Sequence, residues 1–527
     1  MNEQNKMASA MKGLSQKVRT ENGALSFSVE SIENPWVKVF YQLSSFRHRF
    51  VKPTSLKKRH QSLLNNEDLV FIDFKNALDA AKGTDFEKYG IRLALFVRDI
   101  GKGAGERSLG RLMLAELANR RLITPERLAC VLGEEGYGRW DDLIEIAQLT
   151  KNRAFASELD HLVIEQLKKD IETLETSGER AQLSLLAKWM PSIATSSSQT
   201  RRLARHFIRL MKTDNRGYRQ TLSKLRAQLK IVEQKICSRN WSEINYEQLP
   251  SKAALRYAGL FLEKDAERYR AFLDQVQKGD AKVNAATLTA PEIIAKLRQE
   301  RVPDGQTQAC EVLWDALPEI KLNRNLLPVC DVSGSMWTQV GSLQAIDVSL
   351  GLSLYLAQSN TGPFKNLVMS FNNDSRITDL SKYGTLLGKW KVLEQYEGYN
   401  TNIESALNQI LCLAQEYKVS QEELPALVFF SDMEFDAMNC NQKSTKTIFE
   451  VFQGKFEEIG LKMPQVVFWN ICNRTNSVPI LENELGMVLC SGFSQQIMEA
   501  VLACDFPTPW AMLKNTLESA RYKGVLD

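Results

Sequence analysis

The chain has 527 residues, enough for two or more domains that each bury a full-sized core. Its charged and apolar fractions, 25% and 44%, are those of an ordinary soluble protein. The net charge of +4 is unevenly distributed, because residues 311–527 hold 16 Lys and Arg against 25 Asp and Glu, and residues 1–310 hold 51 against 38. This asymmetry favours a polyanion-binding domain joined to a cation-binding one, although two solvated surfaces can differ as much by chance.

The cysteines and histidines exclude several kinds of site. None of the nine cysteines forms a CxxC pair, which argues against a disulfide framework and against structural zinc. The four histidines include no HExxH motif, which disfavours a zinc hydrolase. The N-terminal segment is polar, and no apolar run is long enough to cross a bilayer. We therefore expect a cytoplasmic protein with no signal peptide and no membrane partner.

The first three hundred residues have a helical pattern. Residues 1–30 are expected to form a disordered tail. Over residues 31–318 apolar side chains recur at spacings of three and four, which predicts helices almost throughout. Short connections marked by Gly and Pro are typical of stacked helical pairs. We expect a HEAT-like repeat domain, and such repeats can close into a ring.

One predicted helix in this part carries a basic stripe. Arg202, Arg205, Arg209 and Lys212 recur at spacings of three and four, which places them on one helix face. Such a stripe can follow a phosphate backbone, and guanidinium groups can also stack on unpaired bases. The alternative is the solvated face of an amphipathic helix.

A glycine-rich connection, Arg98-Asp-Ile-Gly-Lys-Gly-Ala-Gly-Glu-Arg107, is a second candidate for anion binding. Its backbone amides, together with Arg98, Lys102 and Arg107, could hold a phosphate. Its spacing is not that of a P-loop, so nucleotide hydrolysis is not predicted. The alternative is a tight turn between helices, in which glycines adopt positive φ and the acidic residues pair with arginines.

From residue 319 the pattern changes to short apolar runs that alternate with helical stretches. This alternation predicts a doubly wound α/β domain over residues 319–527, with a mainly parallel sheet between helices. Ligands of such sheets bind at the carboxyl ends of the strands. The expected strands are Leu326–Val332, Leu367–Phe371, Ala426–Phe430, Gln465–Trp469 and Met487–Cys490.

Three segments at the predicted strand ends carry oxygen ligands. Asp331-Val-Ser333-Gly-Ser335 places one carboxylate and two hydroxyls at alternate positions after a strand. Gly398–Asn402 offers a threonine hydroxyl before a helix, and Phe429–Asp432 offers a carboxylate at a strand end. Oxygen ligands of this kind suit Mg²⁺. For the first segment alone, a helix N-cap is the competing interpretation.

The run DVSGSM resembles the metal-ion-dependent adhesion site (MIDAS) of von Willebrand factor A domains. This resemblance implies a von Willebrand A-like Rossmannoid domain that binds Mg²⁺, or another divalent cation such as Mn²⁺ or Ca²⁺. It also implies an open coordination position that accepts an acidic side chain from a protein partner. The ligands that it implies are Asp331, Ser333, Ser335, Thr401 and Asp432. Neighbouring side chains that could compete for two of these places are Asn400, Asn402 and Ser405 for the threonine, and Asp436 for the second aspartate.

The two halves together are similar to the TROVE-domain proteins, of which the Ro ribonucleoprotein autoantigen is the best known. The resemblance covers roughly residues 35 to 505 and is closer to a less characterised branch of that family. It implies an RNA-binding helical domain joined to a von Willebrand A-like domain. The segments that carry it are Arg98–Arg107, Gly138–Leu143, Leu185–Ser192, Ser431–Asp436, Val466–Asn470 and Ser491–Ser494.

These features predict a multidomain α + α/β protein that binds small structured or misfolded noncoding RNA and has no chemistry of its own. One alternative is a metal-dependent protein–protein scaffold, in which the cation captures an acidic side chain. A second alternative is a metal-assisted hydrolase that uses Asp432 with Glu434 or Asp436, although residues 311–527 contain no histidine.

Overall fold

The computed structural model describes residues 17–20, 25–44, 46, 68–229, 231–299, 305–322, 324–371, 375–395, 401–435, 448–472, 477–479, 487–493, 498, 502 and 508–525. The chain divides into two compact units. The sheet unit comprises residues 1–82 and 285–519, and the helical unit comprises residues 83–284 and 520–527. Within the described part, no helix is long and apolar enough to cross a bilayer.

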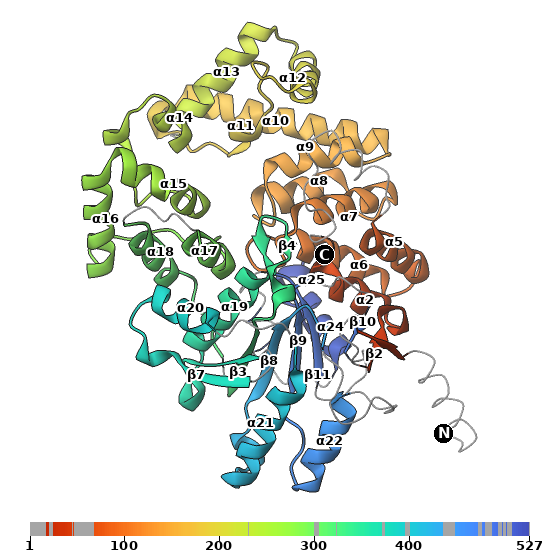
Figure 1. The fold of residues 1–527 in the computed structure, drawn as a ribbon. Coiled ribbons are helices and arrows are strands. Elements are labelled where there is room, and N and C mark those ends of the chain that lie inside the picture. Colours follow the sequence, from red (N-terminus) through yellow and green to blue (C-terminus); the bar gives the residue numbers. More distant parts are fainter. Residues whose placement is uncertain are drawn as a thin grey trace. The chain divides into compact units, whose positions relative to one another are not determined.

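A six-stranded sheet forms the centre of the sheet unit, with the order β11-β9-β8-β3-β6-β7 (Figure 1). All neighbouring strands are parallel except the edge strand β7, which is antiparallel to β6. Chain order reverses between β3 and β8, the adjacent central strands, as in doubly wound sheets. The strands are β3 (Leu326–Asp331), β6 (Leu367–Phe371), β7 (Ser375–Asp379), β8 (Ala426–Ser431), β9 (Val466–Asn470) and β11 (Met487–Ser491).

The central strands form because they are continuous apolar runs, as strands that are covered on both faces must be. Every residue of β3, β8 and β9 is buried. The five strands expected from sequence are present, each to within one residue of its predicted ends. The edge strand β7 was not predicted, because its polar sequence SRITD has no apolar run.

Helices surround this sheet and include some from before residue 319. Helices α2 (Pro35–Tyr41) and α17 (Ala290–Leu297) contact β11 and α19 respectively. Residues 31–82 and 285–318, the two ends of the predicted helical domain, therefore belong to the sheet unit, because their helices pack there. The other described helices of eight or more residues in this unit are α5 (Leu69–Ala81), α18 (Gln306–Asp315), α19 (Ala345–Ser359), α20 (Leu386–Glu394), α21 (Ile403–Glu416), α22 (Ile448–Glu458) and α24 (Pro509–Leu517).

Two short strands lie inside the stretch that was expected to be a disordered tail. β1 (Lys17–Arg19) and β2 (Leu25–Ser28) pair antiparallel, and β2 also pairs with β10 (Ser477–Val478). The sequence offered only a weak signal here, because strands of three or four residues show little periodicity. Residues 1–16 of the expected tail lie outside the described part of the chain.

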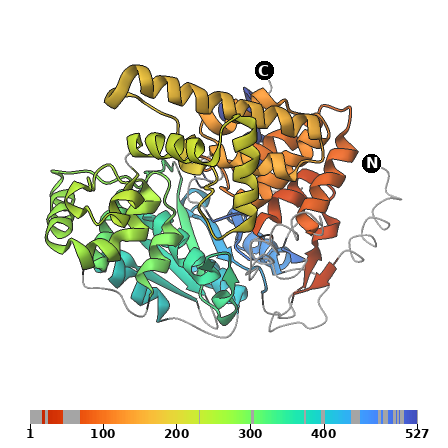
Figure 2. The same cartoon turned by 90° about the horizontal axis from the view of Figure 1, so that it is seen from above.

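The helical unit consists of helices with short connections, and the longest helix is α10 (Figures 1 and 2). Together with the sheet unit it gives the predicted α plus α/β composition. Whether the helices form HEAT-like repeats or a ring stays a prediction. The helices are α6 (Glu87–Arg98), α7 (Arg107–Asn119), α8 (Pro125–Ala129), α9 (Trp140–Leu149), α10 (Arg153–Ser177), α11 (Leu186–Trp189), α12 (Ser198–Leu210), α13 (Asn215–Gln228), α14 (Val232–Cys237), α15 (Ser251–Lys264), α16 (Ala266–Lys278) and α25 (Ala520–Lys523).

A buried carboxylate, Asp142, ties three helices of this unit together. Its Oδ2 accepts a hydrogen bond from the guanidinium of Arg98 on α6, and both side chains are fully buried. Its Oδ1 accepts from Nε of Arg111 on α7 at 2.6 Å, and Oδ2 also accepts from the backbone amide of Arg139 at 2.7 Å, at the start of α9. A Cβ on Gly138 would lie 2.5 Å from the same carboxylate oxygen. Close packing therefore accounts for the glycine and the aspartate in the segment Gly138–Leu143.

The glycine-rich connection between α6 and α7 is also a structural turn. Gly105 has φ +66°, and a Cβ on Gly103 would lie 2.1 Å from the backbone oxygen of Phe96. Asp99 Oδ1 accepts from the amide of Gly101 at 2.8 Å, and the guanidinium of Arg521 pairs with the same carboxylate. The tight-turn alternative therefore accounts for the glycines of this connection.

We predict that Asp142→Asn destabilises the helical unit by about 3–5 kcal/mol, because it leaves Arg98 buried without a counter-charge. Burial of the Asp142 carboxyl opposes its ionisation, but Arg98 and Arg111 outweigh that effect and hold its pKa below the ordinary 3.8. Its contribution is thus complete above pH 3.8 and is lost as the pH falls through the lower folded-state pKa. Urea denaturation at pH 7 and below pH 4 measures both effects.

The matched control is Asp141→Asn. Asp141 pairs with Arg111 at 2.6 Å, but its side chain retains 18% exposure. We expect a loss of less than about 1 kcal/mol for this variant. If Asp141→Asn and Asp142→Asn lose the same free energy of unfolding, the buried pair of Arg98 and Asp142 has no special role in stability.

Candidate metal centre and basic helical surface

The predicted metal ligands lie at the carboxyl ends of β3 and β8, where the strand order reverses. Asp331 is the last residue of β3, and Asp432 directly follows β8. The two strands are parallel neighbours, so their carboxyl ends lie at the same edge of the sheet. This is the edge at which doubly wound sheets form their ligand sites.

The loop after β3 turns tightly around the Asp331 carboxylate. Oδ1 of Asp331 accepts a hydrogen bond from the amide of Ser333 at 3.0 Å. The hydroxyls of Ser333 and Ser335 lie 3.0 Å apart, so the alternate spacing brings them together. Ser333 is only 1% exposed, whereas Ser335 is partly exposed.

Two carboxylates are buried together at this edge. Asp331 is fully buried and Asp432 is 1% exposed. Oδ2 of Asp331 accepts a hydrogen bond from the Ser431 hydroxyl at 2.6 Å. Burial and the charge of Asp432 raise the pKa of Asp331 to about 7. The pair therefore concentrates negative charge in a place from which water is excluded, which a bound cation would neutralise.

Thr401 has a buried hydroxyl without a hydrogen-bond partner in the described part of the chain. Two of its three competitors are engaged elsewhere. Asn402 caps α21 by accepting from the amide of Ser405 at 3.0 Å, and the Ser405 hydroxyl accepts from the amide of Ser375 at 3.0 Å. Asn400 and Asp436 lie outside the described residues. A buried, unsatisfied hydroxyl costs about 1–3 kcal/mol, and a ligand that it coordinates would offset this cost.

The donor set fits a divalent cation. Hydroxyl and carboxylate oxygens are hard ligands, and two carboxylates balance the charge of one such ion. Among the described residues, no group of three or more His, Cys, Asp and Glu side chains could hold a metal. A metal site built from the described residues of this unit would therefore include hydroxyl ligands, as the predicted set does.

Helix α2 and the residues after it lie over this edge of the sheet. The backbone oxygen of Tyr41 accepts from Nδ2 of Asn470 at 3.3 Å, and the amide of Ser44 donates to the Ser491 hydroxyl at 2.9 Å. Burial, followed by the charges of Glu434 and Asp432, raises the pKa of Tyr41. The segment around Tyr41 and Ser44 thus covers the ends of β9 and β11, while Ser335 at the end of the β3 loop remains partly exposed.

Sequence reasoning did not single out these covering residues. Asn470 and Ser491 each end an apolar strand with a polar side chain, which is the signal that could have identified them. Nothing in the sequence indicated that residues 35–44 return to the same edge, because this is a contact over more than 400 positions.

The basic stripe lies on an exposed face of the helical unit. Arg202, Arg205 and Arg209 on α12, and Lys212 just after it, are all exposed. None of the four forms an ion pair within the described part of the chain. The opposite face of α12 buries Phe207 and neighbouring apolar side chains, so the helix is amphipathic. Arg202, Arg205 and Arg209 therefore lie on the exposed face of α12, whereas Lys212, with φ +50°, follows the end of the helix.

The stripe belongs to a wider basic segment. Residues 188–239 contain 13 Lys and Arg and only two Asp and Glu, a net charge of +11. Some basic residues of the segment have structural roles. The guanidinium of Arg226 donates to the backbone oxygens of Ala187 and Met190 at 2.8 and 2.7 Å, and that of Arg201 donates to the backbone oxygen of Ser196 at 3.1 Å. Arg216 and Lys224 on α13 are exposed. Positive charge in this segment thus remains largely on the surface.

The second candidate for anion binding requires a correction at Arg98. This residue is fully buried against Asp142, so it cannot contact an RNA, because the buried carboxylate needs it as a counter-charge. Lys102 and Arg107 are exposed at the two ends of the turn. The structure therefore leaves two of the three predicted cations accessible.

Comparisons with known proteins leave the activity open. Residues 325–509 match the domain of unknown function DUF7788, and residues 143–319 match the domain of unknown function DUF2828. An uncharacterized protein, L728, of Acanthamoeba polyphaga mimivirus is 28% identical over 415 residues, 72% of this chain and 71% of that protein. The RO (RSR) protein of Deinococcus radiodurans aligns over 91% of this chain and 86% of its own, with 15% identity and a TM-score of 0.33. This structural similarity is weak, and no residue role is transferred from it.

We predict that bound Mg²⁺ stabilises the protein against unfolding. The variant Thr401→Val should bind Mg²⁺ at least about tenfold more weakly and should therefore be stabilised less at a given Mg²⁺ concentration. At a concentration 100 times its Kd, the ion should raise the free energy of unfolding by about 2.7 kcal/mol. Without Mg²⁺, the valine variant should be as stable as the parent or more stable, because it removes an unsatisfied hydroxyl. Thermal unfolding across a Mg²⁺ series measures both effects.

Thr378→Val is the matched control, because Thr378 is a threonine of β7 with only 8% exposure. Its response to Mg²⁺ should equal that of the parent. A Mg²⁺ response that is identical in all three proteins, or absent from the parent, would exclude Thr401 as a ligand.

Proposed function

We propose that this protein binds small structured or misfolded noncoding RNA through its helical unit, and that its sheet unit holds a divalent cation at the MIDAS-like site. One observation carries the RNA proposal: the stripe Arg202, Arg205, Arg209 and Lys212 is exposed and makes no ion pair within the described residues. Cations that lack internal counter-charges are available to an external polyanion.

The physics of this surface supports phosphate contacts. An α-helix rises 1.5 Å per residue, so the stripe from Arg202 to Lys212 extends over about 15 Å. Each phosphate that it neutralises releases condensed counterions, which favours binding and makes it dependent on salt. The wider segment 188–239, with its net charge of +11, adds to the attraction at longer range.

The choice of RNA among polyanions rests on the resemblance of the sequence to TROVE-domain proteins. The chain contains no RNP1 motif and no evident KH-type loop, so the proposed recognition depends on charge and shape. Binding of this kind selects structured RNAs by the geometry of their phosphates rather than by base sequence.

A metal-dependent protein scaffold is the second candidate, because the buried Thr401 hydroxyl and the Asp331–Asp432 pair favour a cation site. Bound there, the ion would supply a positive charge for a partner's carboxylate. The segment around Tyr41 and Ser44 lies over the neighbouring ends of β9 and β11, so a partner would approach the ion from the side of the partly exposed Ser335 or displace this segment.

We propose binding rather than catalysis. A metal-assisted hydrolase needs a base beside an accessible reaction site. Glu434, one of the two candidate bases, is fully buried, and Asp436 lies outside the described residues. No histidine is available in residues 311–527 to serve instead.

The RNA proposal is tested with the variant Arg202→Gln/Arg205→Gln/Arg209→Gln. We expect it to bind a small structured RNA at least about tenfold more weakly at 100 mM salt, with a salt slope reduced by roughly 2, because three phosphate contacts are lost. Filter binding across a salt series measures both quantities. Affinity of the parent that does not depend on salt, or no binding at low salt, would remove the proposal.

The control for net charge is Lys264→Gln/Lys278→Gln/Lys282→Gln, which removes three exposed charges from the same unit. Binding by this variant should stay within about twofold of the parent, since only long-range attraction changes. Equal losses in the two triple variants would show that net charge, and not the stripe, governs binding.

The scaffold candidate has a separate test. Retention of a protein partner by the full-length chain should be abolished by EDTA and by Asp331→Ala, and should resist ribonuclease. Retention that survives EDTA, or that ribonuclease abolishes, would count against metal-dependent docking.

A further inference from the structure

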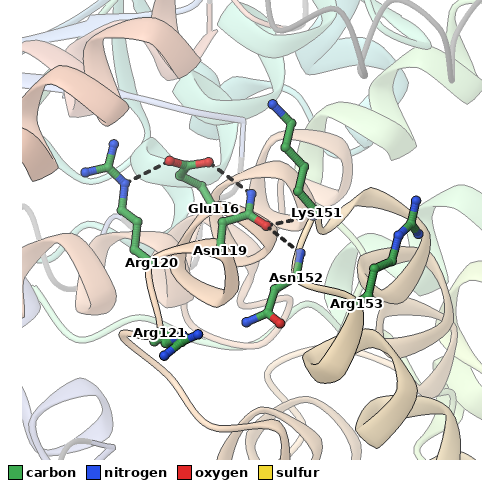
Figure 3. Close-up of a pocket in the computed structure, with 7 residues that line it drawn as sticks. All are labelled: Glu116, Asn119, Arg120, Arg121, Lys151, Asn152 and Arg153. Carbon is green, nitrogen blue, oxygen red and sulfur yellow. Dashed lines mark hydrogen bonds and ion pairs between the residues drawn. The ribbon is translucent and has the colours of Figure 1, made fainter.

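A basic pocket lies in the helical unit between the end of α7 and the start of α10. Its volume is about 640 Å³. Figure 3 shows Arg120 and Arg121 on one side of the pocket and Lys151 and Arg153 on the other. The remaining lining residues are Glu116, Asn119 and Asn152.

The pocket has an excess of positive charge. Four cationic side chains face one carboxylate, that of Glu116, which accepts from Nε of Arg120 at 2.8 Å. Arg121, Lys151 and Arg153 are exposed and make no ion pair within the described part of the chain. The ordinary reason for clustered arginines, pairing with acidic neighbours, therefore accounts for only one of the four cations.

The shape of the pocket is held by hydrogen bonds of two asparagine side chains. Oδ1 of Asn119 accepts from the Thr150 hydroxyl at 2.8 Å and from the amide of Lys151 at 2.7 Å, and Nδ2 of Asn119 donates to Glu116 at 3.2 Å. Asn152 caps α10 by accepting from the amide of Phe155 at 3.2 Å. These bonds fix the connection that presents Lys151 and Arg153 and leave the positive charges of both side chains unpaired within the described residues.

The helix ends do not decide which ion the pocket attracts. The positive end of the α10 dipole and the negative end of the α7 dipole both lie here, and each amounts to about half a charge. They offset each other, so the side chains determine the sign of the potential. Because no aromatic residue lines the pocket, its chemistry selects phosphate groups rather than bases.

We infer that this pocket binds phosphate groups, and that in the working protein these belong to the backbone of a bound RNA. Arg121, Lys151 and Arg153 supply the charge, and the guanidinium groups supply paired donors that match phosphate oxygens. The identification of these phosphates with those of RNA rests on the proposed function. The phosphate-binding chemistry of the pocket does not depend on it.

The test compares the full-length parent with Arg121→Asn/Arg153→Gln. Asparagine suits position 121, because its φ of +59° lies in the left-handed region that asparagine tolerates. The control is Lys168→Gln/Lys169→Gln, which removes two exposed charges from α10 about 22 Å further along the helix. Equal thermal midpoints of the three proteins establish that all are folded.

Two probes separate the pocket from the RNA proposal. One is a small RNA hairpin, followed by filter binding across a salt series, and the other is tripolyphosphate, followed by calorimetry at 50 mM salt. We expect the pocket variant to bind RNA about tenfold more weakly with a salt slope lower by roughly 2, and to lose tripolyphosphate binding. The control should match the parent with both probes.

The remaining outcomes are each decisive. If the pocket variant loses tripolyphosphate binding but binds RNA as the parent does, the pocket binds phosphate but not the phosphates of RNA. A parent that binds tripolyphosphate in the pocket but binds no RNA would overturn the proposed function and leave the pocket chemistry standing. Tripolyphosphate binding that is absent from the parent, or equal in the parent and the pocket variant, would overturn the inference.

Discussion

Electrostatic repulsion between two buried carboxylates is the constraint around which the sheet unit is organised. Asp331 and Asp432 lie at the ends of neighbouring parallel strands, where burial removes the water that would screen them. Hydrogen bonds from the Ser431 hydroxyl and the Ser333 amide stabilise the ionised form of Asp331, yet its pKa remains raised. A divalent cation is the simplest group that would remove this repulsion, and the buried Thr401 hydroxyl, which has no hydrogen-bond partner in the described part of the chain, stays a predicted ligand for it.

The cover formed by α2 changes how such a cation would act. In a docking module the ion meets its partner at an open rim, whereas here the segment around Tyr41 and Ser44 lies over the strand ends. A cation held between Asp331 and Asp432 would join the ends of β3 and β8 and so contribute to the cohesion of the unit. Another protein that approached such an ion from the side of β9 and β11 would first have to displace this segment.

Arginines in the helical unit fall into two classes that sequence alone does not separate. Arg98 and Arg111 serve Asp142 inside the unit, and Arg226 donates to backbone oxygens. Arg202, Arg205 and Arg209 of α12, by contrast, are exposed and form no ion pair within the described residues. Arginines of the first class connect helices and cannot bind a ligand, whereas those of the second class can contact an anion from solution. A basic composition therefore becomes an argument for binding only after the internal pairs have been set aside.

The sequence by itself determined the strands of the main sheet and the amphipathic face of α12. Continuous apolar runs and a spacing of three and four are local properties, and burial acts on them in the same way wherever the segment lies. It also placed Asp331 and Asp432 at strand ends, since the carboxyl ends of parallel strands share one edge. The edge strand β7 was missed, because its polar residues carry no such pattern.

Only the tertiary structure decided which charges are internal and which are free. Arg98 and Arg107 close the same ten-residue segment, yet one is buried against a carboxylate 44 positions away and the other is exposed. The pocket between α7 and α10, and the cover of α2 over the strand ends, depend likewise on contacts between distant parts of the chain. The physical reason is that the burial and the ion pairs of a side chain depend on its neighbours in three dimensions, whereas periodicity is a property of the local sequence.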